Sequence, residues 1–227
     1  MSDLTYSNIV ASGADAETFL QAQLANDLTI LEHQDSLLSA WCNPKGRVIC
    51  LFRVRRNPVG FTMMLPADLA DAVVARMEMF RFRANAEFEV RPTSAEDLRL
   101  DGSFDDWLLT NLRAGIPEIK RAQSEEFTAH MLSLDLLGAV SLDKGCYPGQ
   151  EIISRTHYRG ASRRRLALFE SDTPVAEGDK VSDGKRNVGD VVNAIGNELL
   201  AVVPVDQAEL VLQVSAANLT PRPMSPS

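Results

Sequence analysis

The chain has 227 residues, of which 45% are hydrophobic and 24% charged, and its formal net charge is −8. This length is enough for one large domain or two small ones with a sizeable core. The acidic balance argues against a general electrostatic attraction to nucleic acid or to anionic membranes. The three cysteines are scattered and form no C-x-x-C pair, so neither a disulfide framework nor a structural zinc site is expected.

The first residues lack the features of a targeting segment. Residues 1–6 contain no basic region followed by an apolar one, and no apolar stretch is long enough to span a bilayer. We therefore expect a cytoplasmic protein without membrane contact, in a reducing compartment where cysteines stay free.

The N-terminal third mixes strand and helix patterns. A short strand is expected over residues 5–10, and Asp15 suits the N-cap of a following helix. Four leucines then recur at helical spacing: Leu20, Leu24, Leu28 and Leu31. Further strands are predicted over 36–41, 48–55, 61–65 and 87–90, a turn at 43–46 and a helix over 66–80. This mixture of hairpins and helices indicates an α+β class.

The second half changes character twice. Residues 92–106 are polar and predict a loop, and helical segments are expected at 107–112 and 127–137. After Arg165, short alternating runs are separated by Gly, Asp and Asn, which predicts a small β-barrel with strands at 166–169, 188–192, 199–203 and 210–214. We therefore predict an α+β region over 1–162, a C-terminal β-barrel domain over 163–216 and a disordered tail over 217–227.

An arginine cluster interrupts the acidic balance. Five arginines fall close together, downstream of Lys144: Arg155, Arg159, Arg163, Arg164 and Arg165. A local basic cluster on an acidic protein indicates a defined anionic ligand, and a solvated surface explains it equally well.

The run KGCYPGQEIISRT at residues 144–156 carries the most chemical information. Gly145 and Gly149 bracket a tight turn, and Pro148 suits the start of a helix over 150–158. Cys146 would then precede a helix N-terminus, where the dipole and the charge of Lys144 favour a thiolate. A buried cysteine that fills a gap in a Gly-Pro loop fits the same spacing, so the reactive and the structural interpretations both stay open.

This run resembles the signature of the YgfZ-type folate-binding proteins, relatives of the glycine-cleavage T protein (aminomethyltransferase). The signature residues are Lys144, Gly145, Cys146, Tyr147, Gly149, Gln150 and Glu151, followed by Arg155. Segments 12–24, 43–47, 114–117 and 136–141 resemble other parts of the family in the expected order, so the similarity covers nearly the whole chain up to the tail.

The resemblance implies a fold and a function together. The fold is a T-protein-like mixed α/β folate-binding region with a small C-terminal β-barrel. The function is an accessory role in assembly or repair of iron–sulfur clusters in client enzymes, including radical tRNA-modifying enzymes, with Cys146 essential. The implied cofactor is tetrahydrofolate or another folate, whose glutamate tail the arginine cluster would bind.

Two aromatic residues match the positions that family members place against folate. These are Tyr6, where some members have Trp, and Trp107. Aromatic faces suit a flat pterin ring. Tyr6 as a strand-edge residue and Trp107 as part of a helix core are the alternatives.

The chain also departs from its relatives. Compared with the longer bacterial members that it resembles, the chain is shortened between about residues 91 and 105, where most of a subdomain is absent. The T protein places a catalytic Asp shortly after the glycine that matches Gly46, and the residues here are Arg47, Val48, Ile49 and Cys50. That difference argues against aminomethyl transfer, and whether the chain is an enzyme at all stays open.

Other candidates are weaker. A folate-dependent one-carbon transferase is the alternative function, and a nucleic-acid-binding module is disfavoured by the net charge and by the few aromatics near the arginines. Cys42 and Cys50 are expected to be structural, and none of His33, His130 and His157 is expected to bind a metal.

Overall fold

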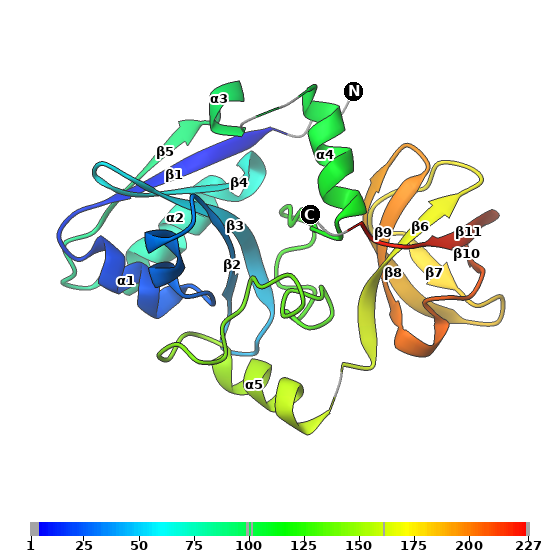
Figure 1. Ribbon diagram of the computed structural model, residues 1–227. Helices are drawn as coiled ribbons and strands as arrows, with labels where there is room; N and C mark the ends of the chain where they lie inside the picture. Colours follow the sequence, from blue (N-terminus) through cyan, green and yellow to red (C-terminus); the bar gives the residue numbers. More distant parts are fainter. Residues whose placement is uncertain (1–4, 99, 101, 161, 226–227) are drawn as a thin grey trace. The chain divides into compact units, whose positions relative to one another are not determined.

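The computed structural model describes residues 5–98, 100, 102–160 and 162–225. The chain divides into two compact units. The sheet unit comprises Met1–Arg99, Ile119–Ala129 and Leu134–Arg155, and the barrel unit comprises Leu100–Glu118, His130–Ser133 and Thr156–Ser227. The elements of both are labelled in Figure 1.

The sheet unit is built on an antiparallel five-stranded sheet in the order β2-β3-β4-β1-β5. Its strands are β1 (Tyr6–Ser12), β2 (Leu37–Cys42), β3 (Val48–Asn57), β4 (Gly60–Pro66) and β5 (Glu87–Pro92). Helix α2 (Ala67–Arg81) packs against β1, β4 and β5, and helix α1 (Ala16–Gln23) packs against β4 (Figure 1). Along β1, Ile9 and Ala11 are fully buried, as the strand's alternation requires.

The predicted leucine stripe is buried, but not on one helix. Helix α1 ends at Gln23, because Leu24 adopts an extended conformation and forms a β-bridge with Trp41. A separate 3₁₀ helix, η1 (Leu28–Glu32), then begins after Asp27, whose carboxylate accepts a hydrogen bond from the Thr29 amide. Both segments bury leucines in the core, so the leucine spacing imitates one continuous helix although the chain breaks between the two segments.

The predicted helix over 127–137 is wrong. Ser133, inside this range, adopts a positive φ angle of 56°, which no continuous right-handed helix allows. The carbonyl of Phe127 instead accepts a hydrogen bond from the Val48 amide at 2.8 Å, so this segment runs beside β3. Within the predicted loop over 92–106, a short helix α3 (Ala95–Leu98) forms.

The barrel unit contains a closed barrel in the strand order β10-β11-β6-β9-β8-β7, which confirms the predicted barrel. Its elements are β6 (Arg164–Ser171), β7 (Lys180–Ser182), β8 (Asn187–Ile195), β9 (Glu198–Pro204), η2 (Val205–Gln207), β10 (Leu212–Val214) and β11 (Ala217–Arg222). Phe169, Leu199 and Leu219 lie in its core without solvent exposure. Closure pairs β10 with both β11 and β7, so the sheet has no edge strand.

The division of the chain differs from the predicted break at residue 162. Helix α4 (Phe104–Arg113), opened by a capping box between Ser103 and Asp106, lies in the barrel unit. Arg113 donates to the carboxylate of Glu198, and the side chain of Asn193 bonds both backbone groups of Glu118 at 2.9 Å. These long-range polar contacts attach residues 100–118 to the barrel, and local sequence patterns do not reveal them.

The predicted disordered tail is wrong over Ala217–Arg222, which form β11. This strand pairs with β10 and with β6, and Leu219 is fully buried. Pro221 lies near the end of β11, where the strand pairs with β6 and no longer with β10. Residues 226–227 of that predicted tail lie outside the described residues.

Among the described residues, helices that combine the length and the apolar character needed to cross a membrane are absent.

Candidate functional site

Cys146 is the exposed cysteine of the chain. It lies on the loop that precedes helix α5 (Gln150–Arg159), whereas Cys42 and Cys50 are buried in the sheet unit. Burial raises the pKa of the Cys42 thiol to about 12 and that of Cys50 well above its usual range. Both buried thiols are therefore protonated and inert at neutral pH, as expected for structural cysteines.

Lys144, two residues before the exposed thiol, anchors the loop. Its ammonium donates to the backbone oxygens of Gln21 at 2.5 Å, Leu24 at 2.8 Å and Asn26 at 2.9 Å. Burial lowers the pKa of Lys144 to about 8, and the nearby Asp27 carboxylate opposes that shift. An ammonium has three donors, so all of them are used by carbonyls and none is left for the Cys146 sulfur.

Tyr147 and Gly149 fix the other side of the loop. The Tyr147 hydroxyl donates to the Ser141 carbonyl at 2.9 Å, and its ring is buried. Gly149 has φ of +83°, and a Cβ there would lie 2.6 Å from the Asn43 carbonyl oxygen and 2.9 Å from the Gly46 Cα. The signature therefore packs against the turn at residues 43–47 and requires glycine at this contact.

A polar network that sequence reasoning missed orders this turn. The Asn43 amide donates to a Glu125 carboxylate oxygen at 2.6 Å, and the same carboxylate is bound by Arg76. Hydrogen bonds from Asn43 and Arg76 lower the pKa of Glu125, so it stays ionised and acts as an acceptor. The partners Asn43 and Glu125 are far apart in sequence, and no local signal connects them.

The remaining signature residues fall into two groups. Gln150 donates to the Lys144 carbonyl at 3.2 Å and so closes the loop on itself. Gly145, Glu151 and Arg155 are exposed, and a Cβ on Gly145 would meet no atom within 4 Å. Hydrogen bonds and packing thus give Lys144, Tyr147, Gly149 and Gln150 a structural role in the loop. The side chains of Cys146, Glu151 and Arg155 are exposed and accessible to a partner.

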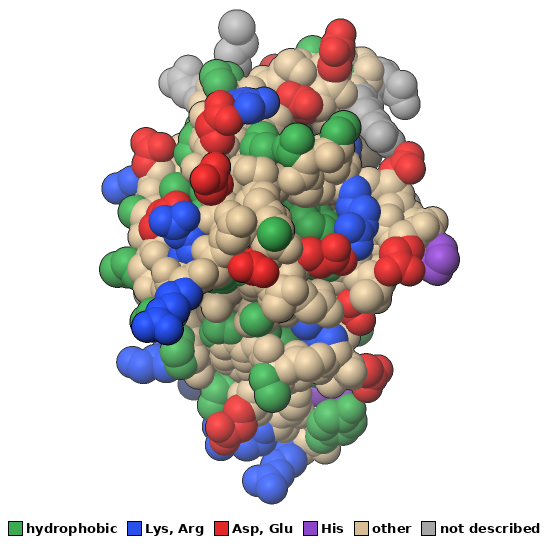
Figure 2. Space-filling view, turned by 90° about the vertical axis from the view of Figure 1, so that its left-hand side faces the viewer, with side chains coloured by type: hydrophobic (Ala, Val, Ile, Leu, Met, Phe, Trp, Pro, Cys, Tyr) green, Lys and Arg blue, Asp and Glu red, His purple; other side chains and the backbone are tan. Residues whose placement is uncertain are grey.

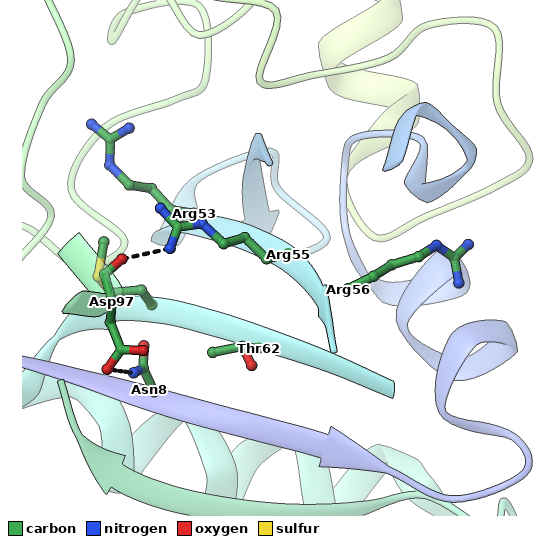
Figure 3. A pocket seen from close by; sticks show the side chains of 7 residues that line it. Asn8, Arg53, Arg55, Arg56, Thr62 and Asp97 are labelled. Atoms are coloured by element: carbon green, nitrogen blue, oxygen red, sulfur yellow. Dashed lines mark hydrogen bonds between the residues drawn. The ribbon is translucent and has the colours of Figure 1, made fainter. Parts of the chain in front are cut away.

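A pocket of about 90 Å³ lies on the sheet, on the face opposite α2 (Figure 3). Its lining is Asn8, Arg53, Arg55, Arg56, Thr62, Met64 and Asp97. The Asp97 carboxylate accepts from the Asn8 amide at 2.9 Å, while Arg55 donates to the Asp97 carbonyl. Because one water occupies about 30 Å³, the pocket admits a carboxylate group or a ring edge and not an entire folate.

The two predicted folate contacts belong to different units. Tyr6 lies on β1 in the sheet unit with 8% of its surface exposed. Trp107 lies on α4 in the barrel unit, half-buried, and stacks on Phe104 with ring centroids 5.7 Å apart. Contact with folate stays a prediction for each of them.

One histidine pairing in the barrel unit was also missed. The imidazole rings of His130 and His157 have centroids 6.3 Å apart, and a ring nitrogen of each lies within 4.8 Å of the other. Two imidazoles at this separation are compatible with a shared divalent ion. The expectation that no metal binds therefore stays a prediction.

The predicted arginine cluster is divided by the structure. Arg155 lies in the sheet unit, whereas Arg163, Arg164 and Arg165 lie in the barrel unit. On the face shown in Figure 2, acidic and basic side chains are interspersed with apolar ones. Mixed charge of this kind does not produce a single basic field on that face.

Comparison with known proteins supports the resemblance drawn from the signature. Residues 163–225 match the family described as CAF17, C-terminal beta-barrel domain. The tRNA-modifying protein YgfZ of Klebsiella pneumoniae (strain 342) is 28% identical over 274 aligned positions, which cover 91% of this chain and 81% of that protein. The protein of the same name from Escherichia coli O157:H7 (strain EC4115 / EHEC) is 25% identical with 91% and 82% coverage.

A solved structure gives the same fold. The crystal structure of glycine cleavage system aminomethyltransferase T from Bartonella henselae matches 97% of this chain and 83% of its own with a TM-score of 0.72, at 14% sequence identity. The T-protein-like fold with a C-terminal β-barrel is therefore confirmed, and so is the resemblance to YgfZ-type proteins. The 274 aligned positions exceed the 227 residues of this chain, so these relatives carry segments that it lacks.

Proposed function

We propose that this chain is a folate-binding accessory protein for the assembly or repair of iron–sulfur clusters, with Cys146 as its essential thiol. The clients would include tRNA-modifying enzymes, as the names of the relatives suggest. The observation that carries the proposal is the exposure of Cys146 between Lys144 and Tyr147, which are buried and hydrogen-bonded. A loop held on both sides presents its sulfur to a partner in a defined place.

The chemistry of a single exposed thiol fits an accessory role. Iron–sulfur clusters are commonly held by four thiolates, and the chain has three cysteines, two of them buried. Cys146 would therefore act on a cluster or a thiol of a client, as a transient ligand or nucleophile, and not as part of a resident cluster.

Folate binding is supported by the fold and by the arginine-lined pocket on the sheet. The glutamate end of folate carries carboxylates, and guanidinium groups such as those of Arg53 and Arg55 bind carboxylates in bidentate geometry. Tyr6 and Trp107 remain the proposed aromatic contacts for the ring system. We expect affinity for tetrahydrofolate in the micromolar range, about −8 kcal/mol.

Aminomethyl transfer is the alternative, and the turn after Gly46 argues against it. Residues 47–52, directly after Gly46, include no carboxylate, and Glu125, whose carboxylate reaches this turn, is bound by Asn43 and Arg76. Its lowered pKa makes it a poor general base. An aminomethyltransferase assay with tetrahydrofolate separates the two functions.

Complementation tests the essential thiol. In a strain that lacks the native gene, Cys146→Ser should fail to restore the activity of an iron–sulfur tRNA-modifying enzyme, because serine is not ionised near neutral pH. The matched control is Cys42→Ser, which removes a buried thiol and should still function wherever it folds. Thermal melts of each variant, with folate titrations, separate loss of function from loss of fold. Full complementation by a folded Cys146→Ser protein would refute the reactive-thiol role.

A further inference from the structure

A second pocket lies in the barrel unit and includes Arg163 and Arg164, two members of the arginine cluster. Its volume is about 770 Å³, within the range of small-molecule sites in proteins. The lining is Arg163, Arg164, Arg186, Pro204, Val205, Asp206 and Gln207. All these residues belong to one unit, so the pocket does not depend on how the two units are placed.

Strand pairing brings the lining together from three parts of the barrel sequence. At the start of β6, Arg164 pairs with Pro204 at the end of β9, and the Val205 amide donates to the Arg163 carbonyl at 3.1 Å. Arg186 enters from the turn between β7 and β8, and the Arg164 guanidinium donates to the carbonyl of Val188 on β8. Three arginines from two separate segments of the barrel unit therefore line this pocket.

The pocket is basic although the chain is acidic. Three arginines and Asp206 give the lining a formal charge of +2, on a chain whose net charge is −8. The side chain of Arg163 makes no hydrogen bond or ion pair with the residues that the structure describes. Arg186 is 77% exposed, and its Nε lies 3.8 Å from Asp183. Both therefore keep donors available to an anion.

The third arginine is placed by its neighbours. Arg164 lies 3.9 Å from the Asp190 carboxylate, which also binds Lys180. Its bond to the Val188 carbonyl holds the guanidinium in a fixed orientation. A fixed guanidinium suits a phosphate group because it offers parallel N–H donors.

The rest of the lining supplies apolar surface and an amide. Pro204 and Val205 are apolar, and Val205 is 52% exposed, so a flat ring can pack there. The Gln207 Oε1 is buried and has no hydrogen-bond partner among the described residues. The Gln207 side chain can therefore turn toward the pocket without breaking a hydrogen bond of its oxygen. A ring N–H or an amino group of a ligand would then donate to that oxygen.

We propose that this pocket binds a nucleoside phosphate, either a free nucleotide or the phosphorylated end of an RNA strand. The phosphate would be bound by Arg163, Arg164 and Arg186, and the base would lie on Val205 with its polar edge toward Gln207. A phosphate concentrates its charge on one group, which suits a single pocket lined by three arginines better than the separated carboxylates of folate do. A single pocket of this size recognises one nucleotide and does not make a duplex-binding surface.

Calorimetric titration of the full chain with nucleoside monophosphates tests the proposal. We expect saturable binding that is about tenfold weaker in Arg163→Gln, because a charge-assisted hydrogen bond is lost. Arg222→Gln, which removes an exposed arginine of the same barrel that pairs with Glu170, is the matched control and should bind as the unaltered chain does. Gln207→Leu should retain the binding of phosphate but lose discrimination among the four bases.

Two RNA trinucleotides, one with a 5′ phosphate and one without, distinguish an RNA end from a free nucleotide as the ligand. Binding of the phosphorylated strand alone assigns the pocket to RNA ends, and binding of mononucleotides only assigns it to free nucleotides. Three results would overturn the proposal: no saturable binding of any of these ligands, inorganic phosphate binding as tightly as nucleotides, or displacement of the nucleotide by folate in competition. The last would make this pocket part of the folate site.

Discussion

A Cβ atom on Gly149 would lie 2.6 Å from the carbonyl oxygen of Asn43, so the close contact between these two residues is possible only with glycine at position 149. The positive φ of Gly149, +83°, places its Cα against the turn at residues 43–47. This contact joins the turn to the start of α5 and thereby positions the loop that carries Cys146.

Gly149→Ala should destabilise the chain by about 1–3 kcal/mol, because the added Cβ meets backbone and the φ angle is strained for alanine. The matched control is Gly145→Ala, where an added Cβ meets no atom within 4 Å, and we expect its effect within about 0.5 kcal/mol. Urea denaturation measures both. Equal effects of the two substitutions would show that the Gly149–Asn43 contact does not support the loop.

Alkylation of the native protein should distinguish the three thiols. Iodoacetamide at neutral pH should modify Cys146, which is exposed, while Cys42 and Cys50 should react only after denaturation. The reason is steric and electrostatic, since burial both excludes the reagent and raises the pKa of each buried thiol. Peptide mass spectrometry reads out the sites. Rapid native labelling of Cys50 would contradict the buried sheet position.

Lys144 should make the free energy of unfolding depend on pH. Its pKa in the folded chain is about 8, below the usual 10.5, so between these values the unfolded chain holds more protons than the folded chain. The contribution of Lys144 to the free energy of unfolding is therefore constant below about pH 8 and increases as the pH rises toward 10.5. Lys144→Met lacks the titrating amine, so the excess stability of the unaltered chain over this variant should grow across that window.

The same variant should also be less stable at neutral pH. Three backbone carbonyls lose their donor, and each buried unsatisfied group costs about 1–3 kcal/mol. Lys45→Met, at an exposed lysine in the neighbouring turn, is the control and should retain the stability of the unaltered chain at neutral pH. A pH-independent difference between Lys144→Met and the unaltered chain would disprove the buried titration.

Folate binding should depend on the pocket on the sheet. Arg53→Gln should weaken tetrahydrofolate binding about tenfold, because a guanidinium–carboxylate bond is lost. Arg91→Gln, at an exposed arginine paired with Glu89 on β5, is the control and should bind normally. Isothermal titration reports the affinities, and identical values for both variants would remove Arg53 from the site.

Tryptophan emission gives a second readout of the same binding. The chain has two tryptophans, and Trp41 is 1% exposed. Quenching by folate should therefore vanish in Trp107→Phe, and Trp107→Ala should also lower the affinity. Undiminished quenching in Trp107→Phe would exclude Trp107 as the folate contact.

Local chemistry in the sequence determined much of this protein. The alternation of apolar residues predicted β3, β4 and the strands near Phe169 and Leu199, because burial of one strand face imposes a period of two. The glycines and proline of the signature predicted a turn before α5, and the single thiol within it was identified before its exposure was known.

Long-range contacts decided the rest. The carbonyls that hold Lys144, the Glu125 carboxylate at Asn43 and the attachment of α4 to the barrel all join residues far apart in the chain. β11 is a strand because its partners β6 and β10 complete the barrel, whereas the three prolines of residues 220–227 suggested a disordered tail. A backbone preference acts within a few residues, whereas hydrogen bonds and packing depend on which segments the fold brings together. The tertiary structure alone therefore showed how the signature residues hold Cys146 in place.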